Sequence, residues 1–389
     1  MREHVQMMTL GTVATYINGR AFKPAEWETS GLPIIRIQNL TSSTTQVNYT
    51  TQRFEDKYLV HNGDLLFAWS ASLGAHIWNG EDAWLNQHIF RVVPNEGIDK
   101  KYLYYYLCKI VQELYSKTHG SGMVHITKAP FMNTAIPVYP LEEQQRIVAR
   151  IEELFSQLDD AEATLQKTKA QLAVYRQAAI SSAFPSLPED EWVRLDCIAE
   201  IAGGITKGRD LSGQRTIELP YLRVANVQNG YLDLSVMKTI ELKESEKVRY
   251  LLKEGDVLYT EGGDRDKLGR GTVWRGEIPE CVHQNHIFKA RLQRDKALPE
   301  YVAYWSMSTF ARNYFYEKGK QSVNLASINK TVLSALKLPI LSMGEQKNVV
   351  SEIDMRLSVC NSIEQTINQL LLQVIATRQS ILSSVFRGE

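Results

Sequence analysis

The 389-residue sequence predicts an α+β protein in which two tandem mixed α/β domains are separated by two long helices. The helices are expected to form an antiparallel coiled coil with an approximate two-fold axis. Three observations lead to this fold: the segment 337–389 repeats an earlier segment, two segments carry a heptad pattern, and the two remaining segments resemble each other. We expect domains at 1–140 and 186–340, and helices at 141–185 and 341–389.

The repeat has a constant offset of 202 residues, so that Pro137 corresponds to Pro339 and Phe184 corresponds to Phe386. No insertion or deletion interrupts the alignment. Further identical pairs are Glu143 and Glu345, Gln144 and Gln346, Arg176 and Arg378, Gln177 and Gln379, Ser181 and Ser383, and Ser182 and Ser384. Internal repetition reflects duplicated structural units, so the chain is ordered as domain, helix, domain, helix.

Each domain is predicted to contain more sheet than helix. Short β-branched and aromatic runs alternate with Asn-Gly, Gly-Asp and Gly-Gly pairs, which is typical of strands joined by turns. Segments 32–39 and 58–67 of the first domain resemble 219–226 and 250–259 of the second. The tyrosine-rich run 102–107 predicts a helix packed on the sheet. The two domains are therefore diverged copies of one fold.

The first long helix carries an apolar seam with a period of 3.5 residues through 147–182. Pro140 suits its first turn, and Pro185 ends the helix because proline cannot continue the hydrogen-bond ladder. The residues predicted to pair with the other helix are Ile151, Leu158, Leu165 and Leu172.

The second long helix carries the same seam through 349–384, with Arg356 as its one misfit. Ser342 and Glu345 form a capping-box pattern at its start. The residues predicted to pair with the first helix are Ile353, Ile363, Ile367 and Leu370.

Pairing of the two helices is the favoured arrangement. Each is ~65 Å long at 1.5 Å per residue, and neither can hide its apolar stripe alone. The alternative is that each helix packs on its own domain. Antiparallel pairing is expected because the first helix ends where the second domain begins, and a parallel pair would require that domain to span the whole helix. The two domains would then lie at opposite ends of a rod, with the two-fold symmetry that duplex DNA also has.

Candidate base-reading residues lie in the loops where the two domains differ, since the matching segments should be scaffold. These loops are 68–74 and 117–128 in the first domain and 260–271 and 318–330 in the second. Arg or Lys can pair with guanine, and Asn or Gln with adenine. The candidate DNA contacts are Ser70, Ser72, Lys117, His119, Lys128, Arg265, Lys267, Arg270, Lys318, Lys320, Gln321 and Asn324. The alternative is that these are ordinary solvated surface loops.

Catalytic motifs are missing from the sequence. The segment 202–208 has the wrong spacing for a Walker phosphate loop, and there is neither a dinucleotide fingerprint nor the Asn/Asp-Pro-Pro-aromatic run of amino-methyltransferases. Asp233, Glu241 and Lys243 superficially resemble a nuclease metal site. Carboxylates at that spacing are usually surface charges, and the first domain has no equivalent. His88 and His286 lie in apolar strands, where a structural histidine is the simpler interpretation.

Composition restricts the class of protein further. The 44 basic and 44 acidic residues cancel, which argues against coating nucleic acid by charge alone. DNA contacts must come from local loops or be shared with a basic partner. The four cysteines lie far apart, without metal or redox spacing. No apolar run reaches the ~18 residues that a bilayer span needs, and the N-terminus carries no targeting segment. We expect a cytoplasmic, metal-free protein without a membrane partner.

Two segments resemble a known family. Residues 140–148, Pro-Leu-Glu-Glu-Gln-Gln-Arg-Ile-Val, are similar to the conserved helix of the specificity subunits of type I restriction-modification systems. Residues 187–195, Leu-Pro-Glu-Asp-Glu-Trp-Val-Arg-Leu, resemble the start of their target-recognition domains. The layout of domain and helix covers the whole chain. Departures are small: the second helix has Ser342 to Gln346 where the motif expects a proline, and Met7 stands where the second domain has Trp192.

The resemblance implies a non-catalytic subunit that reads a split double-stranded DNA target, with one half read by each target-recognition domain. Two methyltransferase subunits would dock on it and methylate adenine, and restriction subunits would join them for cleavage. This chain would bind no cofactor, because S-adenosylmethionine would belong to the methyltransferase subunit and ATP with Mg to the restriction subunit. The helices would set the spacer between the half-sites.

Two other classes of protein share part of this pattern. A coiled-coil scaffold that does not bind DNA would also have paired helices, but the basic, glycine-rich loops at equivalent places in both domains favour DNA reading. A nuclease in its own right would rest on Asp233, Glu241 and Lys243.

Overall fold

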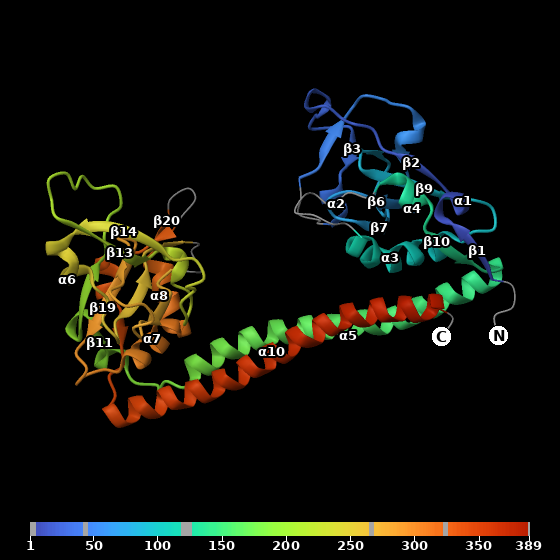
Figure 1. Cartoon of the computed structure of the whole chain (residues 1–389). Coiled ribbons are helices and arrows are strands. Elements are labelled where there is room, and N and C mark those ends of the chain that lie inside the picture. The colour runs from blue at the N-terminus through green and yellow to red at the C-terminus, as the bar shows by residue number, and fades with distance from the viewer. Residues whose placement is uncertain (1–4, 42–45, 118–126, 264–267, 322–325, 388–389) are drawn as a thin grey trace. The chain divides into compact units, whose positions relative to one another are not determined.

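The computed structural model describes residues 5–41, 46–117, 127–263, 268–321 and 326–387 (Figure 1). The chain divides into two compact units, Met1–Leu165 with Gln369–Glu389, and Gln166–Asn368. Each unit contains one α/β domain and parts of the two long helices, α5 (Leu141–Ser182) and α10 (Met343–Arg387). In the described part of the chain, no helix has the combined length and apolar character that crossing a bilayer requires.

The first domain is built around a four-stranded antiparallel sheet of order β2-β9-β6-β7. A second sheet has the order β4-β3-β8-β5, and β1 pairs with β10. In chain order the elements are β1 (Gln6–Thr9), α1 (Leu10–Val13), β2 (Ala14–Asn18), β3 (Leu32–Ile35), α2 (Ile37–Thr41), β4 (Asn48–Thr50), β5 (Leu59–Val60), β6 (Leu65–Ala68), β7 (Gly74–Ile77), β8 (Ala83–Leu85), β9 (Ile89–Pro94), α3 (Lys100–Lys117), α4 (Lys128–Met132) and β10 (Ala135–Val138).

The second domain repeats this topology. Its sheet β12-β19-β15-β17 corresponds to β2-β9-β6-β7, the sheet β14-β13-β18 corresponds to β4-β3-β8, and β11 pairs with β22 as β1 does with β10. In chain order the elements are β11 (Val193–Arg194), β12 (Ala199–Gly203), β13 (Thr216–Leu222), β14 (Lys238–Lys243), α6 (Lys247–Tyr250), β15 (Val257–Thr260), β16 (Gly262–Gly263), β17 (Gly271–Val273), β18 (Val282–His283), β19 (Ile287–Leu292), α7 (Pro299–Met307), α8 (Thr309–Lys318), β20 (Lys320–Gln321), β21 (Ala326–Ser327), α9 (Lys330–Ser334) and β22 (Lys337–Leu338). The predicted pair of tandem mixed α/β domains is confirmed.

The end of each long helix completes the core of a domain. Phe184, just beyond α5, packs edge-on against Tyr301 and Trp305, with ring centroids 5.3 and 5.0 Å apart. In the first unit, Phe386 of α10 packs against Tyr102 at 5.2 Å. Both phenylalanines belong to the main apolar cluster of their unit. The domain that precedes α10 thus receives the end of α5, and the domain that precedes α5 receives the end of α10.

The start of each helix is fixed to the domain before it by a fully buried glutamine. Gln144 accepts from the Asp99 N–H at 2.8 Å and donates to the Gly97 carbonyl at 2.9 Å. Gln346 does the same in the second unit, where it accepts from the Leu298 N–H at 2.9 Å. A buried amide is stable only when its polar groups are bonded, so these contacts define the angle at which each helix leaves its domain.

α5 and α10 run antiparallel within each unit, as predicted. In the second unit, Lys169 Nζ lies 2.9 Å from Asn368 Oδ1, whereas Arg176, further along α5, bonds to Asn361, earlier in α10. In the first unit, Arg378 contacts Glu162, and Leu165, further along α5, lines one groove with Gln373, earlier in α10.

The ionic contacts between the helices follow the repeat. Arg176 Nη2 lies 2.8 Å from Glu364 Oε2 in the second unit. In the first unit the residues at the corresponding positions exchange roles, and Arg378 Nη2 lies 2.9 Å from Glu162 Oε2. The arginine of one helix copy thus meets the glutamate of the other copy, and the same holds with the two copies exchanged. Such reciprocal contacts are typical of a self-complementary interface.

The heptad pattern predicted only one of the two rows that face the other helix. Leu158, Leu165 and Leu172 lie in the expected row on α5. The 3.5-residue seam through 147–182 has a second row that would include Tyr175, and this row is displaced by one residue in the structure: Tyr175 is 53% exposed, and Arg176 is half-buried in its place. Glu162 and Lys169 occupy the same row as Arg176. Long polar side chains can bury their stems and still pair at the ends, so they replace apolar residues beside the seam.

The same correction applies to α10. Ile353 and Ile367 are buried, and Ile353 belongs to the main apolar cluster of the second unit, but Ile363 and Leu370 each keep 40% of their surface exposed. Leu370 only borders the groove between the helices. Arg356, the misfit of the predicted seam, does face α5: its Nη1 lies 3.1 Å from Ser182 Oγ.

Candidate nucleic-acid interface

The two loops singled out in the second domain form one small sheet. Gly262 and Gly263 of β16 pair with β21, and β21 also pairs with β20. The Ile328 N–H extends this pairing by donating to the Glu261 carbonyl at 2.8 Å. Segments 260–271 and 318–330 are therefore brought together by the fold.

Several predicted DNA contacts lie around this small sheet. Lys318 ends α8 and Lys320 lies in β20, and both are exposed. Arg270 is half-buried, and its Nη1 donates to Gln228 Oε1 at 3.1 Å. Of Gln321 the structure describes the backbone, which lies in β20. Arg265, Lys267 and Asn324 lie outside the described residues.

The predicted contacts of the first domain are more scattered. Ser72 is exposed, and Lys128 is the exposed first residue of α4. Lys117 is described by its backbone, at the end of α3, and His119 lies outside the described residues.

Ser70 does not fit its predicted role, because it is only 2% exposed. The loop that carries it is short. Leu73 packs in the core, and its N–H donates to the Tyr115 hydroxyl at 2.8 Å, which holds the segment against the domain.

The two histidines interpreted as structural occupy equivalent places, at the turn before the last strand of the main sheet. The His286 side chain keeps 55% of its surface exposed, and its Nδ1 lies 2.6 Å from Glu261 Oε2. His88 is half-buried, and its ring lies 4.8 Å from the Trp69 indole. The predicted placement within strands is wrong, because His88 and His286 precede β9 and β19. His286 is held by Glu261, so its interpretation as a structural histidine stays a prediction. The available sequence signal was an amide residue before the histidine in both copies.

Sequence reasoning missed the histidine of the second domain that is fully buried, His283. Its Nδ1 lies 3.2 Å from the Tyr250 carbonyl oxygen. Burial, together with the nearby Lys289 ammonium, lowers the pKa of His283 to about 4. Lys289 is itself buried and donates to the Arg249 and Leu251 carbonyls at 2.9 and 3.0 Å, and burial lowers its pKa to about 8.

An ion pair next to this cluster explains the Gly-Asp segment that both domains share. Asp256 is buried and accepts two bonds from Arg291, at 2.8 and 2.7 Å. In the first domain Asp64 lies 3.9 Å from Arg91, which by strand register corresponds to Lys289 and not to Arg291. Both aspartates also accept from a backbone N–H three residues earlier, Asp64 from His61 at 2.9 Å and Asp256 from Lys253 at 2.8 Å. The shared aspartate is thus part of the scaffold.

The buried His283 should make the second domain less stable in acid. A histidine whose pKa is about 4 when folded and ~6.5 when unfolded stabilises the fold fully above pH ~6.5, and this contribution is lost as the pH falls through about 4. The loss should reach about 3 kcal/mol. In urea unfolding from pH 7 to pH 4, the variant His283→Asn, whose amide can replace Nδ1 as donor, should lose less stability than the native chain. Equal losses would contradict the assignment.

The three residues that suggested a nuclease site take part in ordinary local contacts. Asp233 accepts from Ser235 N and Oγ at 3.0 and 2.6 Å, and these bonds lower the pKa of its carboxyl. Glu241 accepts from Thr216 Oγ1 at 2.6 Å, and Lys243 ends β14. Among the described residues, no group of three or more His, Cys, Asp and Glu side chains is placed to hold a metal ion.

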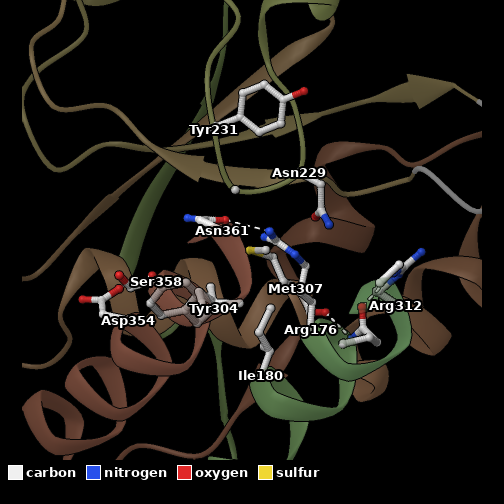
Figure 2. Close-up of a pocket in the computed structure, with 14 residues that line it drawn as sticks. Arg176, Ile180, Asn229, Tyr231, Tyr304, Met307, Arg312, Asp354, Ser358 and Asn361 are labelled. Carbon is white, nitrogen blue, oxygen red and sulfur yellow. Dashed lines mark hydrogen bonds between the residues drawn. The ribbon is translucent and has the colours of Figure 1, made fainter. Parts of the chain in front are cut away.

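A polar pocket of about 720 Å³ lies in the second unit where the two helices meet α7, α8 and the turn that carries Asn229 and Tyr231 (Figure 2). Its arginines tie these elements together. Arg176 bonds to Asn361 at 2.7 Å, and Arg312 donates to Gln177 on α5 at 2.8 Å. We therefore assign this pocket to the joint between helices and domain.

Comparisons with known proteins agree with this architecture. The sequence model of the family described as "Type I restriction modification DNA specificity domain" matches residues 2–171 and again 189–373. Two tandem copies of such a domain define the class of protein. The chain belongs to the type I restriction-modification DNA specificity domain family.

Several similar proteins are named specificity subunits of type I restriction enzymes. The type I restriction enzyme EcoBI specificity subunit of Escherichia coli is 25% identical over 98% of this chain and 85% of the relative. The EcoKI specificity subunit of Escherichia coli strain K12 is 26% identical over 70% of this chain and 61% of the relative. The StySPI specificity subunit of Salmonella potsdam is 24% identical over 98% of this chain and 88% of the relative.

Solved structures share the fold. A chain from a structure titled as the basis of "complex assembly" and "conformational transition" of the type I R-M system matches with a TM-score of 0.68 and 19% identity, over 99% of this chain and 98% of that one. The HsdS subunit from Thermoanaerobacter tengcongensis matches with a TM-score of 0.51 and 18% identity, over 99% and 97% of the two chains.

Proposed function

We propose that this chain is the DNA sequence-specificity subunit of a type I restriction-modification complex, and that each α/β domain reads one half of a bipartite target. One observation carries the proposal: the two domains share one strand topology, whereas the loops above it differ. The second domain has the small sheet β16-β21-β20 where the first has a short loop anchored by Leu73. A common scaffold with different loops is what the reading of two different half-sites requires.

The helix pair sets the distance between the half-sites in this proposal. In each unit, corresponding residues join α5 to α10 by an ion pair, Arg176–Glu364 in the second and Arg378–Glu162 in the first, which supports a role for the helix pair as a whole. The helix length would then act as a ruler for the spacer.

Catalysis belongs to partner subunits in this proposal. Two methyltransferase subunits dock on the helices and methylate adenine with their own S-adenosylmethionine, and restriction subunits with ATP and Mg join them for cleavage. Exposed apolar side chains on the helices support such docking: in the second unit, Val174 is 71%, Met355 64% and Val359 55% exposed. The chain itself would bind no cofactor and would act in the cytoplasm, where the DNA is.

The test is to map methylated adenines in DNA from cells that carry this chain with its partner subunits. A bipartite motif is expected. Exchange of residues 10–136 for the corresponding segment of another family member should then change only one half of that motif. A change in both halves would contradict separate reading by the two domains. A scaffold that does not touch DNA would leave the motif unaltered in every exchange.

Arg270→Ala should relax recognition of the second half-site. The Arg270 carbonyl accepts from the Thr260 N–H close to the start of β16, while its guanidinium bonds to Gln228. The loss of a bidentate base contact costs about 1–3 kcal/mol. Methylation rates on targets altered in the second half-site measure the effect. Arg215→Ala is a matched control in the same domain, because the Arg215 side chain is 88% exposed and pairs with Glu244. Equal rates for the native chain and Arg270→Ala would remove this loop from the interface.

A further inference from the structure

Two positions next to the main sheet are structurally equivalent in the two domains but carry different chemistry. The backbone N–H of Trp69 donates to the His88 carbonyl at 3.1 Å, and the backbone N–H of Glu261 donates to the His286 carbonyl at 2.9 Å. The same backbone bond therefore aligns Trp69 with Glu261 and His88 with His286. The histidine is kept, whereas the residue facing it changes from an indole to a carboxylate.

A third position belongs to the same place. Asn18 pairs with Phe90 in the first domain, and Gly203 pairs with Phe288 in the second. Because Phe90 and Phe288 each follow the histidine by two residues, Asn18 and Gly203 are also equivalent. Three strands thus bring together one triplet in each domain.

The first-domain triplet is aromatic. Trp69 Nε1 donates to Asn18 Oδ1 at 3.0 Å, and the indole packs on the His88 ring at 4.8 Å and on Phe90 at 5.7 Å. The indole N–H is thus directed within the triplet, towards Asn18.

The second-domain triplet is polar and rich in acceptors. A carboxylate can only accept, so His286 donates from Nδ1 to Glu261 across 2.6 Å. Asn285 Nδ2 lies 3.2 Å from the other ring nitrogen of His286. A carboxylate has two oxygens with two lone pairs each, so Glu261 can hold His286 and still accept from a ligand.

The glycines beside this triplet differ in whether the fold requires them. At Gly204 a Cβ would lie 2.0 Å from the His283 carbonyl oxygen, and at Gly19 in the first domain it would lie 2.0 Å from the Asn86 carbonyl oxygen, so the fold needs both glycines. At Gly203 the nearest atom would be 3.8 Å from a Cβ, which is ordinary contact. The fold does not require this glycine, and its small size leaves the triplet open to a ligand that approaches closely.

We propose that Glu261, supported by His286 and Asn285, reads an exocyclic amino group of cytosine or adenine in the major groove of the second half-site. The inference rests on the proposed function. Glutamate and aspartate accept from the cytosine N4 amino group, and adenine offers its N6 amino group in the same groove. A carboxylate repels phosphate, so its place beside a basic loop with Lys320 fits a base edge better than the DNA backbone. Asn18, Trp69 and His88 occupy the corresponding place for the first half-site.

The test uses Glu261→Gln in the complete complex with its methyltransferase subunits, on a DNA library randomised in both half-sites. Glutamine keeps the size of the side chain and replaces one acceptor oxygen by a donor. The preference at one base pair of the second half-site should weaken by roughly ten-fold, or move to a base with an acceptor there, while the first half-site stays unchanged. The base preferred by the native complex at that position tells cytosine from adenine.

Glu254→Gln makes the same chemical change on the exposed surface of the same domain and should leave the whole profile unchanged. The double variant Gly203→Asn, Glu261→Trp rebuilds the first-domain triplet in the second domain and should alter the same base pair as Glu261→Gln. A library profile of Glu261→Gln identical to that of the native complex, or a change in the first half-site, would overturn the inference. If the native complex shows no bipartite preference, the proposed function fails instead.

Discussion

Inserting seven residues into each long helix should lengthen the spacer of the methylated target by about three base pairs. Seven residues of helix add ~10.5 Å at 1.5 Å per residue, and one base pair of duplex takes 3.4 Å. The insertions belong after Leu165 in α5 and after Leu372 in α10, because Leu165 and Gln373 line one groove between the helices. A heptad returns every side chain to its row, so the apolar seam and its polar flank are kept.

Mapping of methylated adenines in cells that carry the lengthened chain would measure the spacer. The bases of both half-sites should stay the same, since neither domain is altered. Seven residues added to α5 alone place Arg176 out of reach of Glu364 and should abolish methylation. A lengthened chain that still prefers the native spacer would refute the role of the helices as a ruler.

Phe184→Ala should destabilise the second domain by about 3–5 kcal/mol, as is usual for truncation of a phenylalanine in a core. Phe184 is 8% exposed and packs on Tyr301 and Trp305, which belong to α7. The lost contacts lie in the second domain even though the residue follows the helix of the first. Phe386→Ala should have the reciprocal effect on the first domain, where the ring packs on Tyr102 and Tyr106.

Hydrogen exchange read separately for the strands of each domain distinguishes these outcomes. Phe184→Ala should lower protection in β12, β15 and β19, and Phe386→Ala in β2, β6 and β9. Tyr175→Ala is the control on α5, because Tyr175 is 53% exposed and its loss should change stability by no more than about 0.5 kcal/mol. If Phe184→Ala instead lowered hydrogen-exchange protection in the first domain, the packing of the end of α5 in the second domain would be contradicted.

The helix pair illustrates how far the sequence pattern reaches. The row that contains Leu158, Leu165 and Leu172 follows from the heptad spacing alone. The neighbouring row does not, because Tyr175 and Arg176 are adjacent and either could face α10. The apolar pattern favours Tyr175, whereas the structure places Arg176 at the interface. The choice depends on Glu364, which is distant in sequence and provides the opposite charge.

In the candidate interface, too, the sequence predicts some features and the fold decides others. Loop composition indicates Arg270 and Lys320. The fold places Lys320 in the small sheet, whereas the Arg270 guanidinium bonds to Gln228. The place of Glu261 beside His286 could not be predicted, since it depends on the register of three strands. The same register buries His283 and exposes His286, although both belong to one short segment.

The sequence by itself determined the duplicated layout, the mixed α/β class of each domain and the two long helices. These properties follow from periodic and repeated sequence patterns, which can be recognised without knowing the contacts between distant segments. Only the tertiary structure decided which polar residues pair across the helices, which domain receives each helix end, and which histidine meets solvent. These outcomes depend on contacts between distant segments, and the energy of such a contact is a property of both partners together.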